Sequence, residues 1–289
     1  MKIILAEHFG MCFGVRDAIS QAETLAAEAP LTILGELVHN PLVREQLRAR
    51  GVAEGSLDQT GSTSRRVMIT AHGASDSKRT LWLQRGFDVV DGTCPLVHHA
   101  HEQLKRLVCR GFFPIVIGKQ DHVEIRGLTE DFSEAVVIES AADISKLPAR
   151  DCYGVISQTT QPIDHVRALV SEIQKSHPES EVRFIDTVCR PTKDRQLALR
   201  SLIEVADVIV VVGGHHSNNT RQLAETCRAA GKWVFHVECA DELKSHWFRA
   251  DNVVGLTAGT STLPETVEAI RQRLEEISSN KSNEQQTTP

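Results

Sequence analysis

Short apolar runs alternate with amphipathic segments along almost the entire chain, and this rhythm constrains the fold more than any other feature. The runs are rich in Val, Ile and Leu, and they end at glycine or polar residues, as buried strands of parallel sheets do. The segments between them repeat apolar residues at helical spacing. A strand–helix–strand rhythm predicts an α/β fold with mainly parallel sheets covered by helices.

The expected strands are Lys2–Ala6, Leu31–Leu34, Val67–Thr70, Asp88–Val90, Phe113–Ile117, Ala135–Ile138, Gly154–Ser157, Arg183–Ile185, Val208–Val212, Trp233–His236 and Val253–Thr257. The expected helices are Val15–Ala29, Pro41–Arg50, Asp76–Arg85, Val97–Arg110, Ile163–Ser176, Arg195–Val205, Asn219–Ala230 and Pro264–Ile277. The remaining tail, 278–289, has no apolar residue apart from its final proline, so we expect it to be disordered.

Composition narrows the class of protein. The chain has 289 residues, of which 41% are hydrophobic and 24% charged, as in soluble globular proteins. A net charge of −6 gives no reason to expect a nucleic-acid partner. The first apolar run is too short for a secretion signal, and no stretch approaches the roughly 20 apolar residues of a membrane span. We therefore expect a cytoplasmic protein with no membrane partner.

Three of the seven cysteines follow a predicted strand. Cys12 lies in IILAEHFGMCFGV, Cys94 in VVDGTCPLVHHA and Cys189 in RFIDTVCRPT. These three divide the chain into nearly equal parts, which suggests three similar small α/β units. The expected boundaries are 13–94, 95–189 and 190–277, with 1–12 joining the third unit.

The number of cysteines is odd, no secretion signal is present and no CxxC pair occurs, so a disulfide framework is not expected. Cys109 and Cys227 lie within predicted helices and are expected to be buried small apolar residues, as are Cys152 and Cys239. The three strand-end thiols can meet only if the units face a common centre. Three thiolates suit zinc or an iron–sulfur cluster, and three protein ligands leave one metal position open for chemistry.

Polar side chains also follow the predicted strands, at the edge where ligands of open α/β sheets bind. They are His39, His72, His122, Glu124, Thr159, Thr160, Ser217, Asn218, Asn219, Thr260 and Ser261. Glycines and helix starts in the same loops suit a phosphate or diphosphate. His215 and His216 lie near this edge, whereas His8, His98, His99, His101 and His165 are expected on the surface.

Nine signatures in this chain resemble those of the 4-hydroxy-3-methylbut-2-enyl diphosphate reductase family, also called IspH/LytB. They are GMCFGV, ELVHN, AHG, DGTCP, DHVE, QTT, the Cys189–Thr192 segment, SNN and TAGTS, in family order over about residues 2–275. The resemblance implies three α/β units in a pseudo-threefold trefoil around a central cluster. It implies a 4Fe–4S cluster on Cys12, Cys94 and Cys189, with one iron open.

The activity that the resemblance implies is reductive dehydroxylation of the allylic diphosphate to isopentenyl and dimethylallyl diphosphates, the last step of the non-mevalonate isoprenoid pathway. Ferredoxin or flavodoxin would supply the electrons. Glu124 would be the proton source, with His122 and Thr159 as further catalytic residues. The diphosphate would lie against His39, His72, His122, Thr159, Thr160, Thr192, Ser217, Asn218, Asn219 and Ser261.

The chain departs from the family pattern in four places. Asn218 replaces a serine, Arg126 replaces an acidic residue in HVEIRG, Cys189 is followed by RPT, and GGHHSNN contains a histidine pair. Other readings therefore stay open. They are a paralogue acting on a related allylic diphosphate, a non-catalytic iron–sulfur sensor or electron carrier, and a zinc site. Glu124 could also pair with Lys119 or Arg126 on the surface.

Overall fold

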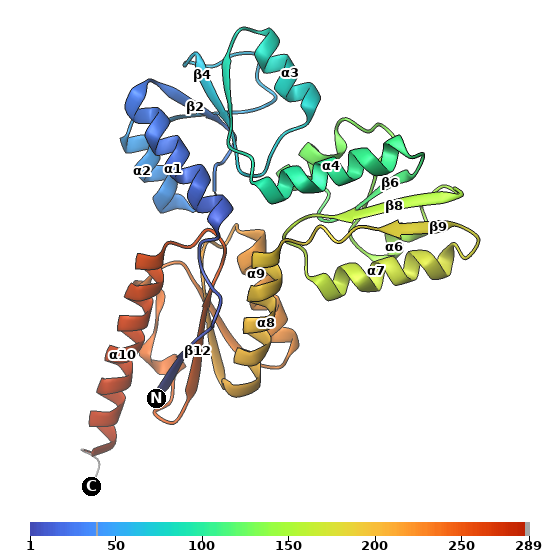
Figure 1. Cartoon of the computed structure of the whole chain (residues 1–289). Helices are drawn as coiled ribbons and strands as arrows, with labels where there is room; N and C mark the ends of the chain where they lie inside the picture. The colour runs from blue at the N-terminus through green and yellow to red at the C-terminus, as the bar shows by residue number, and fades with distance from the viewer. Residues whose placement is uncertain (39, 287–289) are drawn as a thin grey trace. The chain divides into compact units, whose positions relative to one another are not determined.

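The computed structural model describes residues 1–38 and 40–286, with side chains as far as Lys281. It contains three four-stranded sheets, and every strand pairing in them is parallel, which confirms the predicted α/β class (Figure 1). The chain separates into two compact units. Unit 1 holds Met1–Phe13, a short piece around Asn40 and the chain from Lys193 onward, and unit 2 holds the rest.

Unit 1 contains one sheet with the strand order β1-β12-β10-β11. These strands are β1 (Lys2–Leu5), β12 (Val253–Ala258), β10 (Val208–Val212) and β11 (Trp233–Val237). Helices α8 (Arg190–Val205) and α9 (Asn218–Ala229) pack on one face, and α10 (Pro264–Gln286) packs on the other. All five residues of β10, VIVVV, are buried, because helices cover both faces of this central strand.

Unit 2 contains the other two sheets. The first has the order β3-β2-β4-β5. Its strands are β2 (Leu31–Leu34), β3 (Ala53–Gly55), β4 (Arg66–Ile69) and β5 (Asp88–Asp91). Figure 1 shows α1 (Phe13–Glu28) and α2 (Pro41–Ala49) on one side of it and α3 (Asp76–Gln84) on the other.

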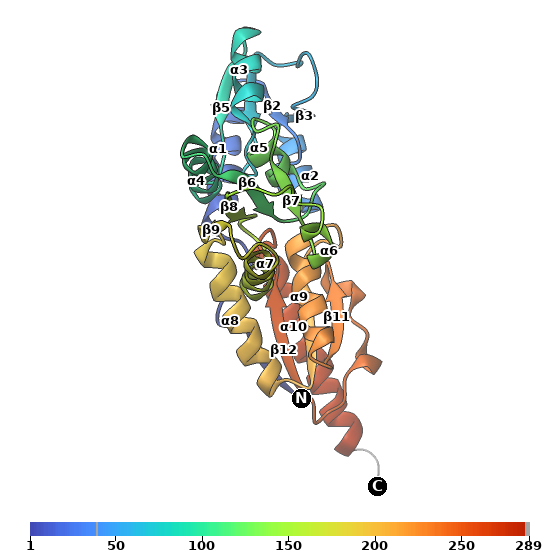
Figure 2. The same ribbon diagram turned by 90° about the vertical axis from the view of Figure 1, so that its right-hand side faces the viewer.

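The second sheet of unit 2 has the order β7-β6-β8-β9. Its strands are β6 (Phe113–Ile117), β7 (Val136–Ile138), β8 (Cys152–Ser157) and β9 (Glu181–Phe184). Helices α4 (Pro95–Cys109) and α5 (Val123–Thr129) cover one face, and α6 (Ala141–Ile144) and α7 (Ile163–Ser176) cover the other. Figure 2, turned by 90°, shows β6, β7 and β8 with α4, α5 and α6 around them.

The three sheets share one plan. The strands β1, β5 and β9 each form one edge of a sheet, and each leads into a cysteine and a helix. The next strands inward, β12, β4 and β8, end in the loops that carry Ser261, His72 and Thr159. This agrees with the three similar units expected from the cysteine spacing, although the boundaries 13–94, 95–189 and 190–277 stay a prediction.

Some local expectations were wrong. Helices α4 and α8 begin at Pro95 and Arg190, earlier than predicted. Prolines at 95 and 191 suit a first helical turn, where a backbone donor is not needed. The sequence analysis missed β3, α5 and α6, which are only three to seven residues long. Elements this short leave too few residues to display a hydrophobic period.

The expected disordered tail is also wrong for most of its length, because α10 continues to Gln286. No glycine or internal proline interrupts this segment after Pro264. Ion pairs one turn apart, such as Arg271 with Glu268 and Arg273 with Glu276, support the exposed face of the helix. The last part, 287–289, lies outside the described residues. Within the described chain, we find no helix with the length and apolar character needed to cross a bilayer.

Candidate functional site

Each of the three strand-end cysteines lies at the start of a helix. Cys12 directly precedes α1, Cys94 is the N-cap of α4 and Cys189 directly precedes α8. All three side chains are partly exposed. Amide dipoles at a helix N-terminus favour the ionised thiolate, which is the form that binds metals.

The backbone holds the three cysteines in the same way. In each sheet the cysteine amide donates to a carbonyl just past the neighbouring strand. The pairs are Cys12 with Thr260 at 3.2 Å, Cys94 with Ala71 at 3.1 Å, and Cys189 with Thr159 at 2.9 Å. The repetition of this bond places each thiol at the carboxyl edge of its own sheet.

The turn before Cys94 is built by Asp91. Its carboxylate accepts hydrogen bonds from the Thr93 amide at 3.0 Å and the Thr93 hydroxyl at 2.5 Å, and it pairs with Arg79. Burial would raise the pKa of Asp91, but these hydrogen bonds and the Arg79 charge hold it below its usual value. Gly14 of α1 lies so close that a Cβ there would be 2.5 Å from the Cys94 sulfur. Only glycine therefore leaves space beside this thiol.

Cys189 and Cys12 have their own supports. The Cys189 thiol donates to the Thr192 hydroxyl at 3.1 Å, and Thr192 is buried. In unit 1 the buried Arg195 donates from Nη2 to the Gly10 carbonyl at 2.5 Å, two residues before Cys12. These contacts order the chain on both sides of the thiols.

A pair of histidines meets at the carboxyl edge in unit 2. The rings of His72, after β4, and His122, after β6, lie edge to face with centroids 5.5 Å apart. His122 is the N-cap of α5, and its Nδ1 accepts the Glu124 amide at 3.1 Å. That bond fixes the ring and leaves Nε2 as the ring nitrogen able to carry the proton in the neutral form.

Glu124 is a buried carboxyl, only 2% exposed, in the first turn of α5. Its Oε1 accepts the Thr159 amide at 2.6 Å. Burial raises the pKa of Glu124 to about 7, against hydrogen bonds from Thr159 that lower it. A carboxyl with this pKa is partly protonated at neutral pH, so it can both donate and accept a proton.

The surface pairing considered for Glu124 is not observed. Arg126 instead pairs with Asp58 at 2.8 Å, and Lys78 pairs with the same carboxylate at 2.7 Å. Hydrogen bonds from Arg126 and Lys78 lower the pKa of Asp58 to about 2. Replacing an acidic residue with Arg126 therefore changes an exposed ion-pair network and leaves the buried carboxyl of Glu124 in place.

The corresponding edge in unit 1 is lined by hydroxyl and amide groups. Ser217 caps α9 by accepting the Thr220 amide, and Asn218 and Asn219 form the first turn. The Nδ2 atoms of Asn218 and Asn219 are buried and have no hydrogen-bond partner among the described residues. Buried donors without partners cost free energy unless a ligand satisfies them, and at a helix N-terminus an anion fits best.

Ser261 lies beside this cap, after β12, and is buried. Its carbonyl accepts the Asn40 side-chain amide at 2.7 Å, which ties the loop to the segment that follows His39. A Cβ at Gly259 would lie 2.1 Å from the Thr220 hydroxyl, so the loop reaches the start of α9 only because this residue is glycine. His39 itself lies outside the described residues.

Comparisons with known proteins agree with these features. A sequence profile described as "LytB protein" matches residues 3–275. The chain belongs to the LytB family. A relative from Trichlorobacter lovleyi named 4-hydroxy-3-methylbut-2-enyl diphosphate reductase is 35% identical, over 96% of this chain and 99% of its own. A relative of the same name from Aquifex aeolicus is 34% identical, over 96% and 97%.

Two solved structures also align with this chain. One described as (E)-4-hydroxy-3-methyl-but-2-enyl diphosphate reductase, the terminal enzyme of the non-mevalonate pathway, has a TM-score of 0.69 and 33% identity, over 95% of this chain and 99% of that one. The reductase from Plasmodium falciparum has a TM-score of 0.87 over 94% and 87% of the two chains. At 23% identity that second likeness supports the fold alone.

Within this LytB chain, the predicted residues fall into two groups. Unit 2 brings together His72, Cys94, His122, Glu124, Thr159, Thr160, Cys189 and Thr192 at the carboxyl edges of its two sheets. Unit 1 brings Cys12, Ser217, Asn218, Asn219 and Ser261 to the carboxyl edge of its own sheet. The roles assigned to these residues stay predictions.

Some expectations about other histidines and cysteines were wrong. His101 is buried in α4, and Cys109, at the exposed end of the same helix, is not. Cys239 is exposed, Cys152 is partly exposed, and Cys227 is fully buried, which raises the pKa of its thiol to about 12. His216 is exposed, while the ring of His215 lies tilted by 60° against that of His236, with ring centroids 4.5 Å apart.

Sequence reasoning missed Asp91, Gly14 and Arg195 as supports of the thiols. Asp91 carried a readable signal, because an Asp two residues before a Thr amide and three before a helix N-cap forms a local turn. Gly14 lies beside the Cys94 sulfur, and Arg195 donates to the Gly10 carbonyl, so each contacts a residue far away in sequence. No local pattern encodes such contacts.

Proposed function

We propose that this LytB protein reduces (E)-4-hydroxy-3-methylbut-2-enyl diphosphate to isopentenyl and dimethylallyl diphosphates. Relatives named for this reductase match nearly the full length of the chain. The observation that carries the proposal is the buried carboxyl of Glu124, bonded to the Thr159 amide at 2.6 Å, beside the His72–His122 pair. An electron carrier needs no proton donor, whereas removal of a hydroxyl group as water does.

Cys12, Cys94 and Cys189 would hold a 4Fe–4S cluster, with one iron open to the substrate. The donor set fits such a group, because each thiol is partly exposed at a helix start and Gly14 leaves space beside the Cys94 sulfur. When bound, the cluster supplies electrons and a Lewis-acidic iron for the substrate hydroxyl. We also propose that three α/β units, with boundaries at Cys94 and Cys189, surround the cluster as a pseudo-threefold trefoil.

The substrate diphosphate would be bound by neutral donors and histidines. Ser217, Asn218 and Asn219 offer a hydroxyl, two buried amide donors and the N-terminus of the twelve-residue helix α9. Ser261, His39, His72, His122, Thr160 and Thr192 would complete the set. Imidazole N–H groups would donate to the diphosphate oxygens.

Glu124 would deliver the proton that lets the hydroxyl leave as water. Its protonated form donates to the leaving oxygen, and the Thr159 amide then stabilises the carboxylate that remains. The Thr159 amide holds the carboxyl in place, and the His122 ring accepts the backbone amide of the same residue. His122 would be the group that returns a proton to Glu124. The raised pKa keeps the acid form available near neutral pH.

Ferredoxin or flavodoxin would be the electron donor, and the protein would act in the cytoplasm. The zinc alternative has less support, because no fourth protein ligand for the three thiolates is apparent among the described residues. A related allylic diphosphate remains the second candidate substrate, since Asn218 stands where the family pattern has serine.

The test is anaerobic purification, iron and sulfide analysis, and assay with the diphosphate substrate and a strong reductant. We expect a cluster of four irons and formation of isopentenyl and dimethylallyl diphosphates. A protein with a full cluster that forms neither product would contradict the reductase assignment. Turnover of only a different allylic diphosphate would identify a paralogue.

A further inference from the structure

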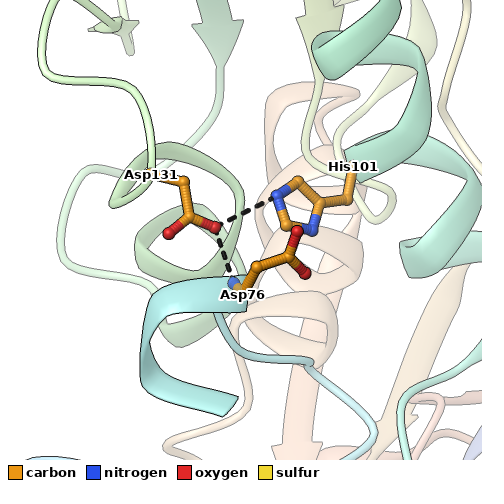
Figure 3. Close-up of side chains that lie close together, drawn as sticks. All are labelled: Asp76, His101 and Asp131. Carbon is orange, nitrogen blue, oxygen red and sulfur yellow. Dashed lines mark hydrogen bonds and ion pairs between the residues drawn. The ribbon is translucent and has the colours of Figure 1, made fainter. Parts of the chain in front are cut away.

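A second cluster of metal-ligating side chains lies in unit 2, outside the site described above. Asp76 begins α3, His101 lies in α4 and Asp131 follows α5. Figure 3 shows the imidazole and the two carboxylates turned toward one another. One ligand atom from each residue lies within 4.8 Å of the others.

His101 is what separates this cluster from an ordinary group of surface acids. Its side chain is only 8% exposed, yet Nε2 has no hydrogen-bond partner among the described residues. The nearest acceptor is Asp131 Oδ2 at 3.7 Å, which is too long for a hydrogen bond. Two ligands of one metal ion are separated by about that distance, since metal–ligand bonds of about 2.1 Å at tetrahedral angles give roughly 3.4 Å.

The two carboxylates are already held in place. Asp131 accepts the Asp76 amide at 2.6 Å and the Ser77 amide at 3.1 Å, so it cannot turn away from the cluster without uncapping α3. These hydrogen bonds lower the pKa of Asp131, although burial opposes them, and burial lowers the pKa of His101. The groups are therefore a carboxylate and a neutral imidazole, which are the forms that bind metals.

We propose that Asp76, His101 and Asp131 form a binding site for a divalent transition-metal cation of the zinc type. One imidazole and two carboxylates suit such a cation, whereas magnesium prefers oxygen ligands alone. Three protein ligands leave the remaining positions to water. The ion would join α3, α4 and the α5–β7 connection, which come from both sheets of unit 2.

Lys105 competes with the metal. Its ammonium group forms an ion pair with Asp76, and it also lies 3.3 Å from Glu102, one turn away on the same helix. Lys105 can therefore release Asp76 and keep an ionic partner. The metal ion would displace the Lys105 ammonium group from Asp76. Removing the lysine should therefore strengthen metal binding.

The test is a zinc titration of the anaerobically purified protein with its cluster, by calorimetry and by elemental analysis after desalting. Iron content and visible absorbance are followed to exclude replacement of iron by zinc. The variants are His101→Gln, Lys105→Gln and the matched control His99→Gln, which alters an exposed histidine of the same helix. Magnesium serves as the control cation.

The wild-type protein and His99→Gln should each bind one zinc ion that His101→Gln lacks or binds at least tenfold more weakly. Lys105→Gln should bind it about fivefold or more tightly, because a nearby positive charge is removed. Equal zinc binding in wild type and His101→Gln would overturn the proposal. Should His101→Gln fail to fold, an unchanged affinity in Lys105→Gln would overturn it equally.

Discussion

The carboxyl edge of the sheet in unit 1 and that of the β7-β6-β8-β9 sheet in unit 2 share one backbone arrangement but carry different side chains. In both, a cysteine after the edge strand donates its amide to a carbonyl past the next strand, Thr260 in one and Thr159 in the other. In both, the loop after the following strand ends in an N-cap, which is Ser217 in unit 1 and His122 in unit 2.

The difference lies two residues after each cap. Asn219 occupies this position in unit 1 and Glu124 occupies it in unit 2. The amide of Asn219 does not titrate and presents a buried donor, whereas the carboxyl of Glu124, with its raised pKa, can exchange a proton. On the proposed function, a repeated scaffold would thus separate anion binding from acid chemistry by a change of side chain at matching positions.

The largest expected effect concerns the strand-end cysteine that the two edges have in common. Cys12→Ser and Cys189→Ser should each lose the cluster and all activity, since a serine hydroxyl replaces a thiolate ligand. Cys94→Ser should do the same. Iron and sulfide analysis with the visible spectrum measures this loss. Cys109→Ser and Cys239→Ser, at exposed positions, are the controls and should keep both cluster and activity. Equal loss in the controls would remove the distinction between the two sets.

The next effect concerns the acid in unit 2. Glu124→Gln keeps the shape of the side chain but cannot release a proton. It should retain iron, sulfide and substrate binding, while turnover falls by about 10²–10⁴-fold, the usual scale for a lost general acid. Single-turnover kinetics with a loaded cluster measures this directly. Near-normal product formation would show that the proton comes from another group.

A smaller effect, on KM, is expected when a carboxylate is placed at the position in unit 1 that matches Glu124 in unit 2. Asn219→Asp replaces a buried donor with a carboxylate of the same shape. It should raise KM by about 5–150-fold, the scale of a lost hydrogen bond to a charged group, with a smaller change in kcat. Gln174→Glu, the same change at an exposed position of α7, is the matched control. A KM unchanged from wild type would argue against a diphosphate at α9.

The pH dependence of kcat tests the acid role of Glu124 in the unsubstituted protein, with Glu124→Gln as the reference. Burial places the pKa of Glu124 near 7, so the carboxyl is protonated below that pH and ionised above it. Because the protonated form is the donor, kcat should fall about tenfold per pH unit above this value. The decline should be absent from the residual activity of Glu124→Gln. A profile that rises through pH 7 would assign Glu124 the role of a base.

Much of this architecture could be predicted because short stretches of sequence determine the strands and helices. The central strand Val208–Val212 reads as a run of buried β-branched residues, and the structure has it at the same bounds. The cysteines and the polar loops follow strand ends, and in a parallel sheet all such ends share one edge. The resemblance in the family signatures adds the prediction that these loops serve one site.

Contacts between distant segments could not be predicted. The meeting of Asp131 with the start of α3, and the ion pair of Arg126 with Asp58, join residues more than 50 positions apart. Helix α5 spans seven residues, too few for a hydrophobic period, although it carries Glu124. His101 was expected on the surface because no local motif surrounds it, whereas it is covered by neighbours from α3 and the α5–β7 connection.

The smallest expected effect is at Arg126. This residue lies on the exposed side of α5, whereas Glu124 is buried on the same helix. Arg126 and Asp58 are about half exposed, at 55% and 49%, so their ion pair is screened and worth only about 0–1 kcal/mol. Arg126→Gln should therefore change kcat and KM by less than about fivefold and leave the pH profile intact. The double variant with Asp58→Asn is the matched control, because it removes the carboxylate that the first change leaves paired with Lys78 alone. If Arg126→Gln shifted the kcat profile along the pH axis, the exposed network would be setting the burial of Glu124. The two faces of α5 would then act together instead of independently.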